Sequence, residues 1–300
     1  MTPEEQDALH ADVLGERRYL VSLAFRMLGT VAEAEDAAQE TYIRWYRLSQ
    51  AERDAIEVPR AWLTRVASRV CLNVLDSARR RHERYVGPWL PEPVPAYAFP
   101  ATTDAFEDPL ERVTLDDSIS TALLVVLESM TPAERVAFVL HDVFAMPFDE
   151  IAEIVGRTPA ASRQLATSAR RRVQQSRSRR VSRAEHDEVV RAFAAAARTG
   201  DIASLITVLD PAVVLRSDGG GFVTAARNPV FGADKVARFL FGALQKNPNA
   251  VVLDQETPDG LGFALWDEGR IIGVVTLDVV AGLVTDLRLM MNPYKLTLWN

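Results

Sequence analysis

The sequence predicts a multidomain chain in which two all-α domains precede one α+β domain. Its 300 residues exceed the usual size of a single domain, and a hydrophobic content of 48% is enough to build several cores. Helical periodicity dominates up to Arg183, whereas strand-like runs dominate after it. Helices followed by such runs imply a terminal domain with helices on one face of a curved sheet.

The first domain, residues 1–86, is predicted to be a bundle of helices. Apolar side chains recur there at helical spacing in three stripes, each of which can face a common core. The stripes consist of Tyr19, Leu20, Leu23, Ala24, Met27 and Leu28, then Ala37, Ala38, Tyr42, Ile43 and Trp45, and then Trp62, Leu63, Val66, Val70 and Leu75. A cluster of arginines follows the third stripe.

A proline-rich linker is predicted at residues 87–109. This segment holds six prolines, so it cannot form a continuous helix. It also carries Trp89, Leu90, Tyr97 and Phe99, and such apolar residues suggest a surface that another part of the chain covers. We therefore expect the linker to dock rather than to hang free.

The second helical domain, residues 110–183, ends in a predicted helix-turn-helix. Two short helices are joined by a tight turn at Gly156, and the second opens with Thr158 and Pro159, a capping residue followed by proline at the first helical position. Apolar residues at helical spacing can pack the two helices together. These residues are Ile151, Ile154, Val155, Leu165 and Ala169.

The surface of the second helix suits the major groove of DNA. Polar side chains at the N-terminal end of such a helix reach base edges, while guanidinium groups beyond them hold phosphates. The polar group near the start is Ser162, Arg163 and Gln164, and the arginines toward the end are Arg170, Arg171 and Arg172.

The last domain, residues 184–300, mixes helices with strands. Helices are predicted at 184–198, 202–209 and 233–244, and strands at 212–216, 251–256, 262–266, 271–279 and 284–291. We expect the strands to form an antiparallel meander with the helices on one face of it.

The charge distribution indicates a polyanionic partner although the formal net charge is −7. Residues 60–84 hold seven arginines against two carboxylates, and residues 157–183 hold nine arginines and no carboxylate. Two basic helical patches on an otherwise acidic chain favour nucleic-acid binding. Cys71 is the only cysteine, the chain has no signal-peptide pattern, and no apolar run approaches about 20 residues. We therefore expect a cytoplasmic protein without a membrane partner.

Two segments resemble regions of bacterial sigma factors. Residues 24–47, AFRMLGTVAEAEDAAQETYIRWYR, resemble region 2, and residues 131–173 resemble region 4. Their order, with a linker but no long region 3 between them, is similar to that of the extracytoplasmic-function (ECF) sigma factors. The resemblance implies that 1–86 is region 2, that 110–183 is region 4, and that the chain directs core RNA polymerase to particular promoters.

The C-terminal domain resembles the SnoaL-like, NTF2-like cone fold, which indicates one subgroup of the ECF factors. Members of that subgroup carry three motifs, WLPEP, DGGG and NPDKL. In this chain the motifs are Trp89, Leu90, Pro91, Glu92 and Pro93; Asp218, Gly219, Gly220 and Gly221; and Asn292, Pro293, Tyr294, Lys295 and Leu296. Tyr294 departs from the usual aspartate.

The resemblance implies a polymerase-binding face in region 2. Asp36, Gln39 and Glu40 are spaced i, i+3 and i+4, so they share one face of a helix. By resemblance, this face would dock on the clamp helices of the β′ subunit of core RNA polymerase. The β subunit is the other expected contact on the polymerase.

The resemblance also implies two DNA-binding surfaces. The residues that would hold the −10 element are Arg65, Arg79, Arg80, Arg81 and Arg84, beside a loop near 48–58 that would capture an unstacked base. The residues that would meet the −35 element are Ser162, Arg163, Gln164, Arg170 and Arg171. Arg163 and Gln164 are the best candidates for reading bases, while Arg170 and Arg171 are better suited to phosphate.

The three motifs predict control within one chain. WLPEP in the linker, with DGGG and NPYKL in the extension, can form one interface between the extension and the sigma domains. Trp89 and Leu90 would be its apolar anchors, because interface energy concentrates in such residues. This interface would hold the two DNA-binding domains in a set relation and would replace a separate anti-sigma factor.

Two other classes of function stay open. A self-contained helix-turn-helix regulator would use its extension to sense a small molecule, through Phe222, Phe231 or Trp266. An isomerase- or cyclase-like enzyme fused to a DNA-binding module would need titratable partners for Asp218, and no His, Cys or Glu accompanies it at a recognisable spacing. Clustered metal ligands are also lacking in the sequence. We therefore expect no catalysis, no metal and no cofactor.

Overall fold

The computed structural model describes residues 13, 15–82, 85–96, 120–177 and 181–300. Contacts divide the chain into two compact units. Of the described residues, the first unit holds 13, 15–81 and 127–172, and the second holds 82, 85–96, 120–126, 173–177 and 181–300. Part of the proline-rich linker and the start of the predicted second helical domain therefore belong with the C-terminal extension.

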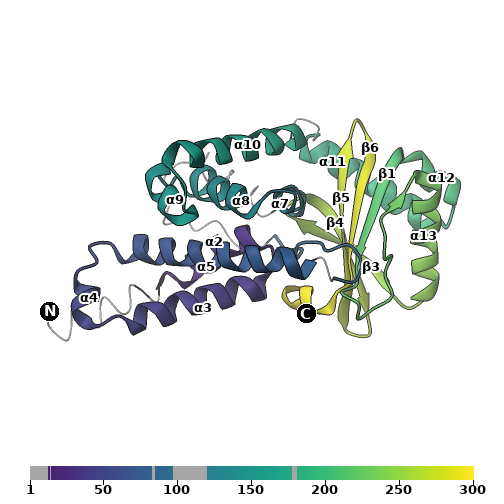
Figure 1. The fold of residues 1–300 in the computed structure, drawn as a ribbon. Coiled ribbons are helices and arrows are strands. Elements are labelled where there is room, and N and C mark those ends of the chain that lie inside the picture. The colour runs from purple at the N-terminus through teal and green to yellow at the C-terminus, as the bar shows by residue number, and fades with distance from the viewer. Residues whose placement is uncertain (1–12, 14, 83–84, 97–119, 178–180) are drawn as a thin grey trace. The chain divides into compact units, whose positions relative to one another are not determined.

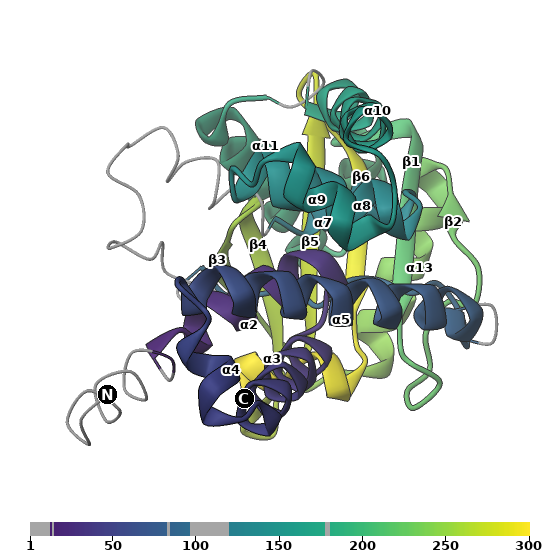
Figure 2. The same cartoon turned by 60° about the vertical axis from the view of Figure 1, so that its left-hand side comes forward.

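Helices build the first unit. They are α2 (Arg17–Leu28), α3 (Val31–Arg47), α4 (Gln50–Asp54), α5 (Pro59–His82), α8 (Pro132–Phe138), a π-helical turn η1 (Val139–Val143), α9 (Phe148–Val155) and α10 (Pro159–Arg177). Figures 1 and 2 show α3 and α5 side by side, with α4 at one end of the pair. Leu20, Leu23, Trp45 and Leu63 are fully buried, as the apolar stripes predict, whereas Ile43 is exposed.

Local sequence signals explain where the helices of the helix-turn-helix begin and end. Thr131 and Glu134 form a capping box at the start of α8, with Pro132 in its first turn. Gly156 adopts a left-handed conformation (φ +65°) at the end of α9, and the hydroxyl of Thr158 accepts a hydrogen bond from Ala161 N at the start of α10. The predicted turn at Gly156 is confirmed.

The second unit contains a six-stranded sheet. The strands are β1 (Leu209–Asp218), β2 (Val230–Phe231), β3 (Val251–Thr257), β4 (Gly260–Asp267), β5 (Arg270–Val280) and β6 (Leu283–Met290), in the order β2-β1-β6-β5-β4-β3. The predicted antiparallel meander holds for β3 to β6, but β1 pairs with β6 in parallel. The prediction of a purely antiparallel sheet is therefore wrong. β1 lies beside β6, the last strand of the meander, rather than beside β3, the first.

The two faces of this sheet carry separate apolar clusters. Helices α11 (Arg183–Thr199), α12 (Ile202–Thr207) and α13 (Ala233–Lys246) pack on one face and bury the larger core, as Figure 1 shows for α12 and α13 beside β1. The opposite face holds a smaller cluster of Leu90, Val274, Met290 and Leu296. Strand residues alternate between the two faces, so neighbours such as Val274 and Val275 belong to different clusters. The helix-covered sheet predicted for this domain is confirmed.

Candidate functional site

The buried carboxylate of Asp218 lies at the centre of the three sequence motifs. Asp218 ends β1, and its side chain is completely buried. It accepts hydrogen bonds from Tyr85 Oη (2.7 Å), Leu90 N (3.0 Å), Gly220 N (3.0 Å) and Lys295 Nζ (2.9 Å). One carboxylate thus joins the linker, the glycine turn and the NPYKL segment.

Lys295 supplies the positive charge of this network. Its Nζ atom also donates to the carbonyl oxygen of Leu90 at 2.6 Å, and it lies 4.0 Å from the centroid of the Trp89 ring and 5.2 Å from that of Tyr85. Burial raises the pKa of Tyr85, and the hydrogen bond to Asp218 and the charge of that carboxylate raise it further. Tyr85 therefore stays protonated and donates to the carboxylate. Residues 85–96 contact Asp218, the glycine turn (Gly219, Gly220 and Gly221) and Lys295. We call this set of contacts the linker dock.

Close packing explains the three glycines of the turn. Gly220 has φ +62°, and a Cβ atom there would lie 2.5 Å from Nδ2 of Asn292. A Cβ on Gly219 would lie 2.7 Å from the Val223 carbonyl oxygen, and a Cβ on Gly221 would lie 3.3 Å from Cβ of Val86. The glycines therefore let the turn approach both Asn292 and the linker.

The rest of the linker segment lies against the smaller apolar cluster. Leu90 is buried against Val274, Met290 and Leu296, and Trp299 Nε1 donates to the carbonyl oxygen of Pro93 at 2.8 Å. Pro91, Glu92 and Pro93 are also buried. The three motifs predicted to form one interface do meet, and Leu90 is its buried apolar anchor. Trp89 is half-buried instead and stacks on a cation.

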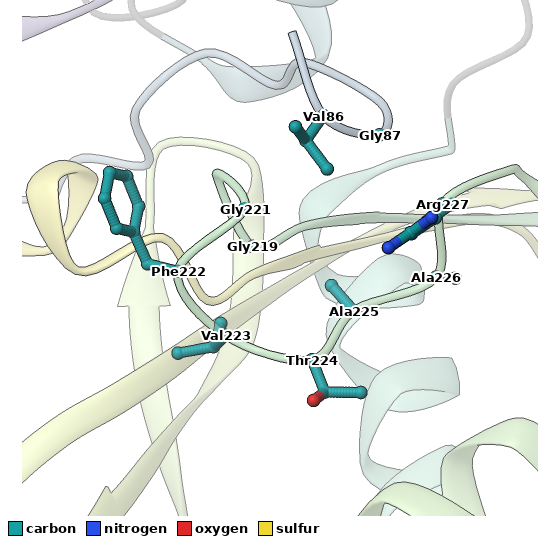
Figure 3. Close-up of a pocket in the computed structure, with 10 residues that line it drawn as sticks. All are labelled: Val86, Gly87, Gly219, Gly221, Phe222, Val223, Thr224, Ala225, Ala226 and Arg227. Atoms are coloured by element: carbon teal, nitrogen blue, oxygen red, sulfur yellow. The ribbon is translucent and has the colours of Figure 1, made fainter.

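A cavity of about 280 Å³ opens beside the glycine turn. Figure 3 shows it between Val86 and Gly87, where the linker begins, and the segment from Gly219 to Arg227. In Figure 3 the Val86 side chain points toward the turn, and the Arg227 side chain points toward the middle of the cavity from the end of the 219–227 segment, near Gly87. The exposed ring of Phe222 lies at its edge and contacts Tyr294 at a centroid distance of 4.8 Å. Phe231 and Trp266 are exposed as well.

The extension also contacts the start of the predicted second helical domain, and the sequence does not predict this contact. Helix α7 (Thr121–Glu128) begins in the second unit, and its first backbone N–H groups need acceptors. The carboxylate of Asp259, in the β3–β4 turn, accepts from Thr121 N at 2.8 Å and from Ala122 N at 2.9 Å. The linker dock already attaches residues 85–96 to the extension. The extension therefore contacts the chain on both sides of residues 97–119.

The predicted polymerase-binding residues share one face of α3. Asp36 and Gln39 are exposed, and Glu40 is half-buried beside Arg44, with which it forms an ion pair at 2.9 Å. The predicted −10 residue Arg65, on α5, pairs with Glu150 at 3.7 Å and Glu153 at 3.5 Å on α9 of the same unit. Arg84 and the side chains of Arg79, Arg80 and Arg81 lie outside the described residues.

The structure of the helix-turn-helix corrects one of the predicted DNA contacts, that of Ser162. The Ser162 side chain is completely buried, so it packs inside the motif and cannot reach a base; its assignment to DNA binding is wrong. Arg163 and Gln164 are exposed, and the Arg163 guanidinium lies 5.1 Å from the centroid of the Phe148 ring. Arg170 pairs with Asp142 at 2.6 Å, whereas Arg171 is exposed. The exposed basic surface of α10 thus begins at Arg163.

Two other features are absent from the described residues. No group of three or more His, Cys, Asp or Glu side chains that could hold a metal ion occurs among them. No helix in this part of the chain is long and apolar enough to cross a membrane. Asp218, the one acid considered for catalysis, is enclosed by its four hydrogen-bond donors.

Comparisons with known proteins agree with this architecture. Residues 13–81 match the family model of sigma-70 region 2, and residues 120–173 match that of sigma-70, region 4. The chain is 44% identical to the ECF RNA polymerase sigma factor SigJ of Mycobacterium tuberculosis over 77% of this chain and 71% of SigJ. It is 36% identical to the probable ECF RNA polymerase sigma factor SigI of the same species, over 97% of this chain and 96% of SigI.

A solved structure extends the likeness to the whole fold. The crystal structure of M. tuberculosis SigJ matches 96% of this chain and 98% of its own, with a TM-score of 0.68 and 37% sequence identity. Each of these relatives is named as an extracytoplasmic-function sigma factor. The chain therefore belongs to the ECF RNA polymerase sigma factors, which bind core RNA polymerase and direct it to particular promoters.

Proposed function

We propose that the C-terminal extension controls this sigma factor in cis by fixing the connection between regions 2 and 4. The observation that carries the proposal is that the extension contacts this connection at two separate points. Asp218 and Lys295 hold residues 85–96 on one side, and Asp259 caps α7 on the other. Only residues 97–119 lie between the two points of attachment.

The geometry of promoter DNA explains how these two contacts can affect the choice of promoter. Each base pair between the −10 and −35 elements adds about 3.4 Å to their separation. Each also turns one element relative to the other, by a full turn in about 10 base pairs. A factor whose two DNA-binding regions are connected through a fixed extension accepts fewer separations than one with a free linker. The extension then acts on the choice of promoter.

The exposed residues of the first unit suit the contacts expected of a sigma factor. In this proposal Asp36, Gln39 and Glu40 dock on the β′ clamp helices of core polymerase, and regions of the factor also touch the β subunit. Arg65, with the arginines at 79–81 and 84, holds the −10 element. Arg163 and Gln164 read the −35 element while Arg171 holds phosphate. The assignment is supported by exposure, which is full for most of the described residues among these and partial for Glu40 and Arg65.

The proposal divides the chain into region 2 (1–86), linker (87–109), region 4 (110–183) and extension (184–300). Because the extension supplies the control, no separate anti-sigma factor is required. We also infer that the extension has no catalytic role. This is supported by Asp218, whose carboxylate is buried and occupied by four donors from its own chain, leaving it without access to a substrate.

In-vitro transcription with core RNA polymerase tests the control. The templates form a series that differs only in the spacer between the −10 and −35 elements. Wild-type protein is compared with Lys295→Met, which removes the charge from the linker dock, and with Lys235→Met, a matched change at an exposed lysine of α13. We expect a sharp spacer optimum for wild type and Lys235→Met, and a flattened profile for Lys295→Met.

Unchanged spacer preference in Lys295→Met would refute the proposal, provided that the linker has been released. Limited proteolysis within residues 85–96 establishes that release. A chain truncated after Arg183 gives a second test, since promoter output equal to that of the full chain would show that the extension exerts no control.

A further inference from the structure

The cavity beside the glycine turn adjoins the linker dock, but none of the described residues that line it makes the dock's hydrogen bonds to Asp218 or Lys295. None of the described residues on α11 or α13 lines it either, so it is separate from the larger apolar core of the extension. Gly87 has φ +86°, and a Cβ atom there would lie 3.6 Å from the carbonyl oxygen of Ala226. The start of the linker therefore closes one side of the space.

The cavity has a cationic lining. Among the described residues Arg227 is the one charged side chain that lines it, and Figure 3 shows this side chain pointing toward the middle of the cavity. Within the described part of the chain Arg227 has neither an ion-pair partner nor a hydrogen-bond partner. The carboxylate beside the turn, that of Asp218, is buried and paired with Lys295. The free guanidinium matches the two oxygens of a carboxylate.

The loop that carries Arg227 offers further hydrogen-bond donors. For residues 224–227, no main-chain N–H group donates a hydrogen bond within the part of the chain that the structure describes. Thr224 adds a hydroxyl group to the lining. Unpaired N–H groups on a loop are a common means of binding anions. This part of the wall therefore suits a ligand that accepts hydrogen bonds.

The part of the lining away from Arg227 is apolar. Figure 3 shows Phe222 and Val223 on that side, and together with Val86 they keep 39–62% of their surface exposed. Covering such surface is favourable, because it removes apolar groups from water. A cavity of about 150 Å³ is large enough for benzene. The 280 Å³ available here is therefore enough for a ring that carries a carboxylate.

We propose that this cavity binds a small organic acid, a carboxylate attached to an aromatic ring or a short apolar group. The carboxylate pairs with Arg227, and the apolar group lies against Phe222 and Val86. One guanidinium suits a single negative charge better than a doubly charged phosphate. Because the ligand contacts both the linker and the extension, its binding strengthens the linker dock. The binding half of the proposal stands by itself, and the regulatory half rests on the function proposed above.

Benzoate is the probe for the binding half, and benzamide, which has nearly the same shape without the charge, is its control. The full chain is titrated with each at constant ionic strength, and ligand-observed NMR gives the Kd. We expect saturable binding of benzoate, and binding of benzamide that is about tenfold weaker or more. Arg227→Gln should weaken benzoate binding to the level of benzamide. Arg191→Gln, a matched change at an exposed arginine of α11 outside the lining, should leave it unchanged.

Three results would overturn the site: no saturable binding of benzoate by wild type, equal affinity for benzoate and benzamide, or unchanged benzoate affinity in Arg227→Gln. The regulatory half is tested by hydrogen exchange at the amide of Leu90, which donates to Asp218. We expect saturating benzoate to slow this exchange about threefold in wild type and Arg191→Gln, and not in Arg227→Gln. Binding without slower exchange would refute the coupling alone and would leave the spacer test of the linker dock unaffected.

Discussion

Two groups of ion pairs, one in each unit of the molecule, use their charges in opposite ways. In the first unit, Arg65 and its partners Glu150 and Glu153 keep 37–60% of their side-chain surface exposed. In the second, Lys295 and Asp218 keep 8% and 0%. Exposed charges can exchange an internal partner for polymerase or DNA at little cost, because an exposed ion pair contributes about 0–1 kcal/mol. A buried pair cannot exchange in this way.

The contrast separates the residues that we propose to meet other molecules from those that hold the chain to itself. Desolvation makes a buried pair a poor source of net stability, but the loss of one partner leaves an uncompensated charge. Such a pair makes a contact specific, because opening the contact would leave a buried charge without its partner. We infer that the linker dock sets a defined arrangement of the chain, while the exposed residues of α3, α5 and α10 stay available for partners.

The largest effect is expected from Lys295→Met. The substitution keeps much of the apolar stem and leaves Asp218 buried without its cation, so the second unit should lose about 3–5 kcal/mol of unfolding free energy. Urea unfolding followed by tryptophan fluorescence measures the loss, with Lys235→Met as the control. A loss below about 1 kcal/mol would place the pair in the same class as the exposed ones and would remove the contrast between the units.

The motifs and the helix-turn-helix could be predicted from the sequence because their signals are local. Gly156, with Thr158 and Pro159, marks the turn through backbone conformation and capping alone. The joining of WLPEP, DGGG and NPYKL was predictable only through the family resemblance. Nothing in the spacing of Leu90, Asp218 and Lys295 along the chain indicates that they meet.

Other features depend on tertiary contacts that leave no local signal. Asp259 caps a helix that begins more than a hundred residues earlier, and the parallel pairing of β1 with β6 spans most of the extension. Ser162 has the polarity of a base-reading residue, but its position on α10 faces the helices it packs against. A helical pattern with few apolar residues did not separate that buried position from its exposed neighbour Arg163.

The next largest effect is expected from Arg163→Ala at the −35 element. Loss of a bidentate contact to a base costs about 1–3 kcal/mol of discrimination, or roughly a five- to 150-fold loss of preference for the cognate −35 sequence. Holoenzyme binding to cognate and scrambled −35 templates measures it. Ser162→Ala should leave the preference unchanged, because its hydroxyl is buried. The reverse ranking of the two variants would contradict this placement of the helix.

A smaller effect is expected from Asp259→Ala. Removing the carboxylate leaves Thr121 N and Ala122 N without their acceptor, and losing such a cap costs about 0.5–2 kcal/mol. Hydrogen exchange of these two amides should accelerate accordingly, while the amide of Leu90 stays protected. Asp254→Ala, at an exposed aspartate of β3, is the matched control. If Asp259→Ala also accelerates hydrogen exchange at the amide of Leu90, then the linker dock and the Asp259 cap open as one cooperative structure.

The smallest effect is expected from Glu150→Gln combined with Glu153→Gln. Both carboxylates are exposed partners of Arg65, so the free energy of unfolding of the first unit should fall by about 1 kcal/mol at most, and by less at high salt. Chemical unfolding at two salt concentrations measures both quantities. A salt-independent loss above about 2 kcal/mol would mean that Arg65 is held as firmly as Lys295. Arg65 would then belong with the internal contacts of the chain, and its assignment to the −10 element would have to be abandoned.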